Sequence, residues 1–104
     1  MDKSPFTLRI SANALADTIE ISSWYETKAQ DLGEQFLNDL EITFQHILSH
    51  PTAFARFKKG SKARKKLMSI FPYKVFYIAE KEEVNILAII HTSRSHKFIK
   101  KQIK

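Results

Sequence analysis

The chain has 104 residues, of which 43% are hydrophobic and 12% aromatic, with only two Gly and three Pro. This length and composition indicate one globular domain over residues 1–104, and they exclude a disordered chain, a collagen-like repeat and a Gly/Ser linker. Cysteine is absent, which excludes disulfides, thiolate metal sites and a cysteine nucleophile. No apolar run is long enough to span a membrane, and the N-terminus lacks the pattern of a secretory signal. We therefore expect a cytoplasmic protein.

The formal net charge of +6 conceals a strong asymmetry along the chain. Residues 1–55 carry three basic and eight acidic side chains, a net charge of −5, whereas residues 56–104 carry fourteen basic and three acidic ones, a net charge of +11. Because the basic residues cluster, we expect a polyanion or an acidic protein as the partner of this half. A charged surface that only keeps the protein soluble is the alternative.

The first half of the chain predicts a strand followed by two helices. Residues 6–10 alternate apolar and polar side chains, the period of a half-buried strand. Ser11 or Asn13 can cap a helix over 12–28, in which Leu15 and Ile19 mark one stripe, although the pattern leaves open which face is buried. Gly33 indicates the break before a second helix, and such a short link favours an antiparallel helix hairpin.

The second helix has the clearest periodicity in the chain, and Pro51 ends it. One face is predicted to be buried and consists of Phe36, Leu37, Leu40, Phe44, Ile47 and Leu48. The opposite face is predicted to be solvated and consists of Glu34, Gln35, Asn38, Asp39, Glu41, Gln45 and His46.

The second half predicts a basic surface loop over 52–63 and then three strands over 64–70, 73–79 and 84–91. The last strand is almost continuously apolar, which is typical of a central strand buried on both faces. The basic tail, 94–104, is either a short helix or frayed. The element order predicts an α+β fold, an N-terminal strand, a helix hairpin and a three-stranded antiparallel sheet, with the other sheet face or its rim left open.

The densest basic cluster lies between residues 56 and 66. Such a patch can bind phosphates through salt-dependent contacts, although a solvated loop is the simpler interpretation of a charge run. Arg64 differs from the others because a strand can hold its guanidinium in position to bind a phosphate or carboxylate. The candidate residues for binding nucleic acid or another target are Arg56, Lys58, Lys59, Lys62 and Lys66.

His91 ends the most buried predicted strand, and Arg94 follows three residues later. Together they could supply a proton-transfer group and a phosphate clamp, although the sequence alone favours a structural histidine at a strand end. His46 and His50 lack a convincing metal-ligand setting. With no glycine-rich phosphate loop, no paired catalytic carboxylates and no serine triad, we expect neither a metal nor a cofactor.

Several short motifs in this order resemble the RelE/ParE toxin superfamily, and the resemblance is greatest to ParE-like plasmid stabilization proteins. The resemblance runs from about Phe6 to Arg94 and depends on the combination rather than on any single motif. The motifs are Trp24-Tyr25-Glu26, Leu32-Gly33-x-x-Phe36-Leu37, Pro51, Arg64, Phe71-Pro72-Tyr73, Tyr77, Ile86-Leu87-Ala88-Ile89 and His91-x-x-Arg94. The family fold implied by them agrees with the element order above.

The resemblance implies the toxin of a type II toxin–antitoxin module, neutralised by an antitoxin whose C-terminal segment wraps around it. ParE-like members poison DNA gyrase, which we take as the leading expectation, whereas RelE-like members cleave mRNA on the ribosome. In the RelE-like case the implied catalytic residues are Arg64, Lys65, His91 and Arg94, with His91 as the proton carrier. A basic binding module that kept the fold and lost the activity is the third possibility.

Overall fold

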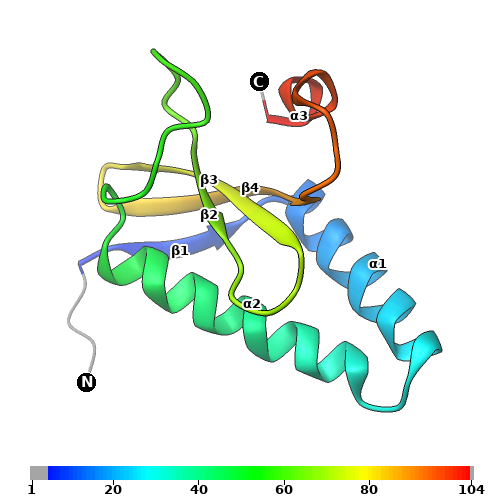
Figure 1. The fold of residues 1–104 in the computed structure, drawn as a ribbon. Coiled ribbons are helices and arrows are strands. Elements are labelled where there is room, and N and C mark those ends of the chain that lie inside the picture. The colour runs from blue at the N-terminus through cyan, green and yellow to red at the C-terminus, as the bar shows by residue number, and fades with distance from the viewer. Residues whose placement is uncertain (1–4, 104) are drawn as a thin grey trace.

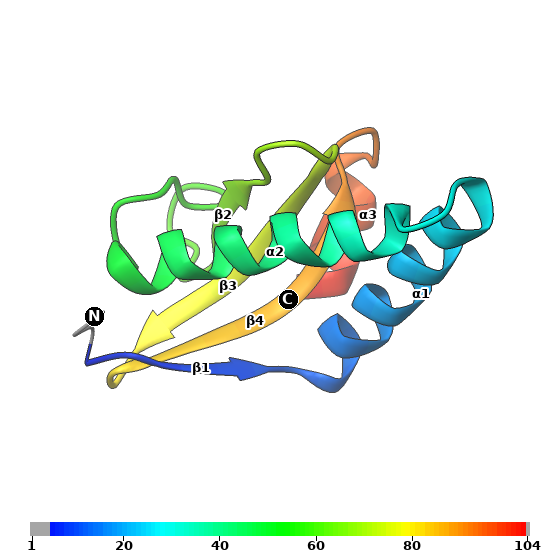
Figure 2. The same cartoon turned by 90° about the horizontal axis from the view of Figure 1, so that it is seen from below.

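The computed structural model describes residues 5–103. Its elements are β1 (Thr7–Ile10), α1 (Ala12–Lys28), α2 (Leu32–Ser49), β2 (Arg64–Leu67), β3 (Tyr73–Glu80), β4 (Glu83–His91) and α3 (His96–Ile103). The strands form one sheet in the order β1-β4-β3-β2, with α1 and α2 on one side and α3 on the other (Figures 1 and 2). This arrangement confirms the α+β fold expected from the sequence.

Strand β4 lies inside the sheet, as its continuous apolar run predicted. It pairs antiparallel with β3 and parallel with β1, so the N-terminal strand joins the sheet beside β4. The turn between β3 and β4 is tight, with positive φ angles of 53° at Lys81 and 60° at Glu82, as two-residue hairpins require. Opposite Tyr77 the register shifts, and Leu87 becomes an extra residue in β4.

Strand β2 is shorter than the predicted 64–70, because residues after Leu67 leave the sheet to contact α2. The backbone N–H groups of Ile70 and Phe71 each donate to Asp39 Oδ2, at 2.9 Å. Asp39 was predicted to lie on the solvated face of the helix. This prediction is wrong, because Asp39 is only 1% exposed. Leu37, predicted to be buried, is 42% exposed.

The buried face of α1 is not the Leu15–Ile19 stripe, since these side chains are 51% and 58% exposed. The helix begins at Ser11, whose Oγ accepts from Ala14 N–H at 3.0 Å. Ala14 is fully buried, and Tyr25 stacks on Phe36 of α2 at 5.9 Å. The small Ala14 side chain allows the helix to lie close to the sheet, which turns Leu15 and Ile19 outward.

The face of the sheet opposite the helix hairpin is covered, contrary to the expectation that it or its rim stays open. The tail forms α3, and its Ile99 and Ile103 are 7% and 8% exposed. They share a second apolar cluster with Phe57 and Ala63 from the predicted surface loop and with Phe76, Ala88 and Ile90 from the sheet. The segment 52–63 and helix α3 therefore both pack on the sheet face that was expected to be open.

Candidate functional site

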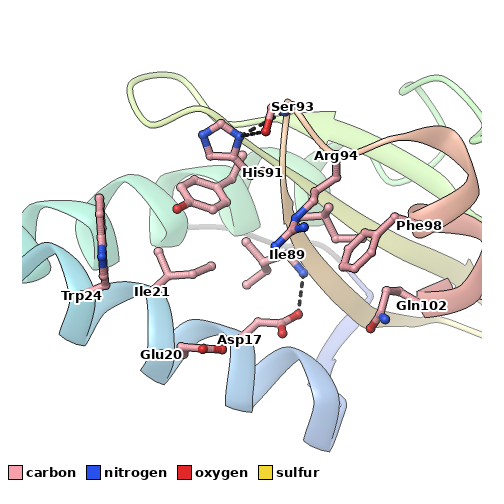
Figure 3. A pocket seen from close by; sticks show the side chains of 12 residues that line it. Asp17, Glu20, Ile21, Trp24, Ile89, His91, Ser93, Arg94, Phe98 and Gln102 are labelled. Atoms are coloured by element: carbon pink, nitrogen blue, oxygen red, sulfur yellow. Dashed lines mark hydrogen bonds between the residues drawn. The ribbon is translucent and has the colours of Figure 1, made fainter.

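A recess of about 490 Å³ lies between α1, the end of β4 and α3 (Figure 3). It brings His91 and Arg94 together with acidic and aromatic side chains that the sequence analysis had not connected to them. Its lining residues are Asp17, Glu20, Ile21, Trp24, Tyr73, Ile89, Ile90, His91, Ser93, Arg94, Phe98 and Gln102. The recess thus has a cationic rim from the β4–α3 turn and an anionic wall from α1.

The His91 ring is held by Ser93. Ser93 N–H donates to His91 Nδ1 at 3.0 Å, and Ser93 Oγ lies 2.8 Å from the same atom. Because Nδ1 accepts a backbone N–H, the proton of the neutral ring is on Nε2. The ring also meets Tyr73 edge-on, with centroids 5.1 Å apart. His91 therefore presents one available nitrogen, Nε2, which donates in the neutral ring.

Arg94 carries the cationic group closest to His91 along the chain. Its backbone N–H donates to the His91 carbonyl at 3.0 Å, which closes the turn after β4. Its guanidinium lies over the Phe98 ring, 4.5 Å from the centroid, and Figure 3 shows it directed into the recess. Within residues 5–103 this guanidinium forms no ion pair, so its charge remains available to an anionic partner.

Asp17 forms the acidic wall through a contact that supports the sheet. β1 ends with Ile10 opposite Ile86, so the Ile89 N–H further along β4 has no strand partner on that edge. Asp17 Oδ2 accepts this N–H at 3.0 Å. Burial raises the pKa of Asp17; the bond from Ile89 opposes the shift, and the negative charge of Glu20 reinforces it.

Arg64 and Lys65 lie away from the recess. Arg64 pairs with Tyr77, whereas His91 pairs with Tyr73, so the two sites are separated by four residues along β3, about 13 Å. Arg64 Nη1 donates to the Phe54 carbonyl at 2.8 Å. Lys65 is opposite Phe76 and therefore projects to the α3 side of the sheet, the opposite side from Arg64. The structure brings His91 to Arg94 but brings neither Arg64 nor Lys65 to them.

Tyr77 shows how Arg64 is used in the fold. The Tyr77 hydroxyl donates to the Pro51 carbonyl at 2.8 Å. Burial raises the pKa of Tyr77 to about 12, and the nearby Arg64 charge acts in the opposite direction. Arg64 therefore occupies a structural position between the end of α2 and the sheet, with its guanidinium holding the chain at Phe54.

The basic segment after α2 is a structured hairpin over residues 55–65, called the basic hairpin below, rather than an irregular loop. Phe57 N–H donates to the Ala63 carbonyl at 2.7 Å, and Lys65 N–H to the Ala55 carbonyl at 2.9 Å. Arg56 Nη1 donates to the Ser61 carbonyl at 2.6 Å, and the Lys66 ammonium lies 5.2 Å from the centre of the Phe54 ring. Lys58, Lys59 and Lys62 are exposed near its tip.

Two kinds of feature, a group of metal ligands and a membrane-spanning helix, are absent from the part of the chain that the structure describes. Residues 5–103 contain no group of three or more His, Asp or Glu side chains placed to bind a metal ion. Over the same residues, none of the helices combines the length and the apolar character needed to cross a bilayer.

Residues 8–96 match the family described as ParE toxin of type II toxin-antitoxin system, parDE. The chain belongs to this family. As a ParE-family member it is a type II toxin, and an antitoxin is its partner. A separate comparison of the sequence with curated proteins finds no match.

Two solved structures resemble the fold of this ParE-family chain. One is described as the chromosomal ParDE TA system from P. aeruginosa, with a TM-score of 0.75, 15% identity, and coverage of 88% of this chain and 100% of that one. The other is the isolated E. coli RelE toxin, with a TM-score of 0.61, 17% identity, and coverage of 92% and 94%. At these identities the likeness shows a shared fold.

Proposed function

We propose that this toxin acts on DNA gyrase and does not cleave mRNA on the ribosome. The observation that carries the proposal is the separation of the candidate catalytic residues. Arg64 lies about 13 Å along the sheet from His91, and its guanidinium is bonded to the Phe54 carbonyl. The ParE family match over residues 8–96 supports the same conclusion.

Cleavage of RNA by its own 2′-hydroxyl would need a base, an acid and cations converging on one phosphate. In the recess, His91 Nδ1 is engaged by Ser93 N–H, and Asp17 is engaged by Ile89 N–H. One imidazole nitrogen, the Arg94 guanidinium and the exposed Glu20 carboxylate remain. The first two can bind an anionic group on a partner, but Arg64 and Lys65, the further cations that cleavage would bring to the same phosphate, lie elsewhere on the sheet.

The antitoxin is proposed to cover the positively charged half of the toxin. Residues 56–104 carry a net charge of +11, so an acidic or amphipathic antitoxin segment would gain attraction and orientation from this surface. Gyrase acts on chromosomal DNA in the cytoplasm, and we place the toxin in the same compartment.

Two reactions in parallel test the target. Purified full-length chain is added to DNA gyrase with relaxed plasmid, and to a translating extract with a reporter transcript. We expect supercoiling to be inhibited and the transcript to stay intact. Cut transcripts with unaffected gyrase would reverse the assignment, and Arg64→Ala or His91→Ala should then abolish the cleavage. If expression neither arrests growth nor affects either reaction, the non-catalytic binding module is the remaining interpretation.

A further inference from the structure

Two basic segments that are far apart in the sequence lie on the same face of the sheet. Phe57 of the basic hairpin and Ile99 of α3 belong to one apolar cluster over β3 and β4. The Phe57 ring also stacks on His96, at the beginning of α3, with centroids 4.7 Å apart and an interplanar angle of 14°. Figure 1 shows the hairpin and α3 rising from the sheet on the same side, away from α1 and α2.

This convergence creates a cationic face built from the hairpin, the sheet and α3. Lys65 of β2 and Lys74 of β3 project to this side. They are opposite Phe76 and Ile90, which both belong to the apolar cluster beneath α3. The cationic face consists of Lys58, Lys59, Lys62, Lys65, Lys74, Lys97, Lys100 and Lys101. Among residues 5–103, the only ion pair from this face joins Lys62 Nζ to Glu80 Oε1, at 3.5 Å.

The lysines are carried on ordered backbone rather than on a loose charge run. In α3, Ile99 and Ile103 are buried against the sheet, while Lys97, Lys100 and Lys101 are exposed on the outer side. The hairpin is fixed by the backbone bonds from Phe57 N–H to the Ala63 carbonyl and from Lys65 N–H to the Ala55 carbonyl, and at its tip Ser61 N–H donates to the Lys58 carbonyl at 3.0 Å. A preformed array of charges loses less conformational entropy on binding a polyanion than a flexible loop does.

We infer that the cationic face binds the phosphate backbone of double-stranded DNA. This inference rests on the proposed function, because it would hold the toxin on the DNA segment that gyrase is processing. Unpaired lysines on one face supply the sequence-independent, salt-dependent part of DNA binding. The acidic helix hairpin, on the other side of the sheet, would face away from the DNA.

The aromatic residues of this region favour duplex DNA over single-stranded RNA. Single strands are bound by exposed aromatic rings on which bases stack. Here Phe57 is only 8% exposed and packs against Phe76 and His96. Phe98 lies beneath the Arg94 guanidinium. Phe57 and Phe98 on this face are therefore both covered, which favours contacts between its lysines and phosphates over stacking of unpaired bases on these rings.

Fluorescence anisotropy with a labelled 30-base-pair duplex of mixed sequence, in the absence of gyrase, tests this inference. The full-length chain is titrated at several salt concentrations, in parallel with a single-stranded RNA of equal length. The test variant is K97Q/K100Q/K101Q, and K58Q/K59Q/K62Q provides the corresponding change in the hairpin. Each triple should lower the slope of log affinity against log salt by about 2–3, since each phosphate contact contributes about 0.9. At 0.1 M salt the affinity should fall about tenfold or more.

A matched control removes three positive charges from other parts of the surface. R9Q/K28Q/K81N has the same net charge as each test triple, and asparagine suits the positive φ of 53° at position 81. We expect its affinity to stay within about twofold of wild type. Far-ultraviolet circular dichroism and thermal melting establish that all three variants are folded.

The inference is overturned if the wild-type chain does not bind duplex at low salt, or prefers the single-stranded RNA. Equal losses in the control and test triples would also overturn it, because net charge alone would then explain binding. Since the assay contains no gyrase, failure here leaves the supercoiling result unchanged. Conversely, duplex binding by a toxin that leaves gyrase unaffected would contradict the proposed target while the cationic face itself is supported.

Discussion

Asp39 links the middle of α2 to the chain segment between β2 and β3. Its Oδ2 accepts two backbone N–H groups, from Ile70 and Phe71. Its Oδ1 is buried with no hydrogen-bond partner among the described residues. The contact holds Phe71 against Phe36, with ring centroids 5.5 Å apart. One carboxylate oxygen of Asp39 therefore fixes the backbone after β2 and positions Phe71 in the aromatic part of the core.

Replacing Asp39 with alanine is expected to lower the free energy of unfolding by about 3 kcal/mol, because two backbone N–H groups lose their acceptor. Asp39→Asn keeps one carbonyl oxygen and should fall between wild type and alanine. Urea unfolding followed by circular dichroism measures the change. The control is Glu41→Ala, at an exposed position of the same helix, which should cost less than about 0.5 kcal/mol. Equal effects at the two positions would contradict the structural role of Asp39.

Asp17 should make stability depend on pH in the opposite direction from a salt-bridged carboxylate. Its pKa is raised by burial, so the folded state binds the proton more tightly than the unfolded state does. The free energy of unfolding therefore decreases as pH rises from the ordinary Asp pKa through the raised value.

Asp17→Asn removes this titration but keeps an oxygen that can accept Ile89 N–H. We expect the variant to be at least as stable as wild type at pH 7, and to lose its relative advantage as the pH is lowered toward 4. Urea unfolding at pH 4, 5, 6 and 7 measures the difference, with Glu34→Gln at an exposed position as the control. A difference between wild type and Asp17→Asn that is constant over this range would contradict the argument.

At the scale of elements, α1 and α2 approach each other at Gly33. A Cβ at this position would lie 2.5 Å from the Ser22 carbonyl oxygen. Gly33 N–H also donates to Glu26 Oε1 at 3.0 Å. The close approach lets the two helices pack near their connection and orients both of them over the sheet.

Gly33→Ala has two opposing effects on the free energy of unfolding. Alanine improves helix propensity by about 1 kcal/mol, whereas the steric overlap with backbone costs about 1–3 kcal/mol or more. We expect a net loss of stability, measured by urea unfolding. Asn38→Ala, at an exposed site in α2, should gain a few tenths of a kcal/mol from propensity alone, so about 0.5 at most. A stabilised Gly33→Ala variant would show that the helices can move apart without cost.

The element order was predictable because the apolar periods of α2 and β4 are strong and local, and the antiparallel pairing of β2, β3 and β4 followed from their short connections. The parallel pairing of β1 with β4 was not predicted. The buried face of α1 was not predictable, because the small Ala14 faces the sheet in place of Leu15. How closely α1 approaches the sheet depends on residues that are distant in the sequence. Asp39 could have been found from its position three residues after Phe36 and four before Thr43, on the same helical face. Its polarity led to the opposite assignment.

The site was predictable only in part. His91 and Arg94 are close in sequence, and their proximity follows from the short turn after β4. Asp17 joined them through α1 packing, which no local pattern in the sequence indicates. The register of β2 on β3 then placed Arg64 beside Tyr77 rather than Tyr73, and strand register is a property of the assembled sheet.

For the whole molecule, the fold turns a charge asymmetry along the chain into an asymmetry in space. Seven of the eleven acidic residues lie in residues 12–49, on α1, α2 and their connection. The basic hairpin and α3 occupy the other side of the sheet (Figure 1). Such a molecule approaches a polyanion with one preferred side, and added salt should weaken that preference.

The most direct test of gyrase as the target is the amount of linear plasmid formed when gyrase, plasmid and the full-length toxin react before detergent and protease are added. We expect linear DNA to increase with toxin concentration and to require gyrase. Adding the cognate antitoxin first should prevent the increase. If the plasmid stays intact and supercoiling continues at high toxin concentration, gyrase is not the target of this toxin.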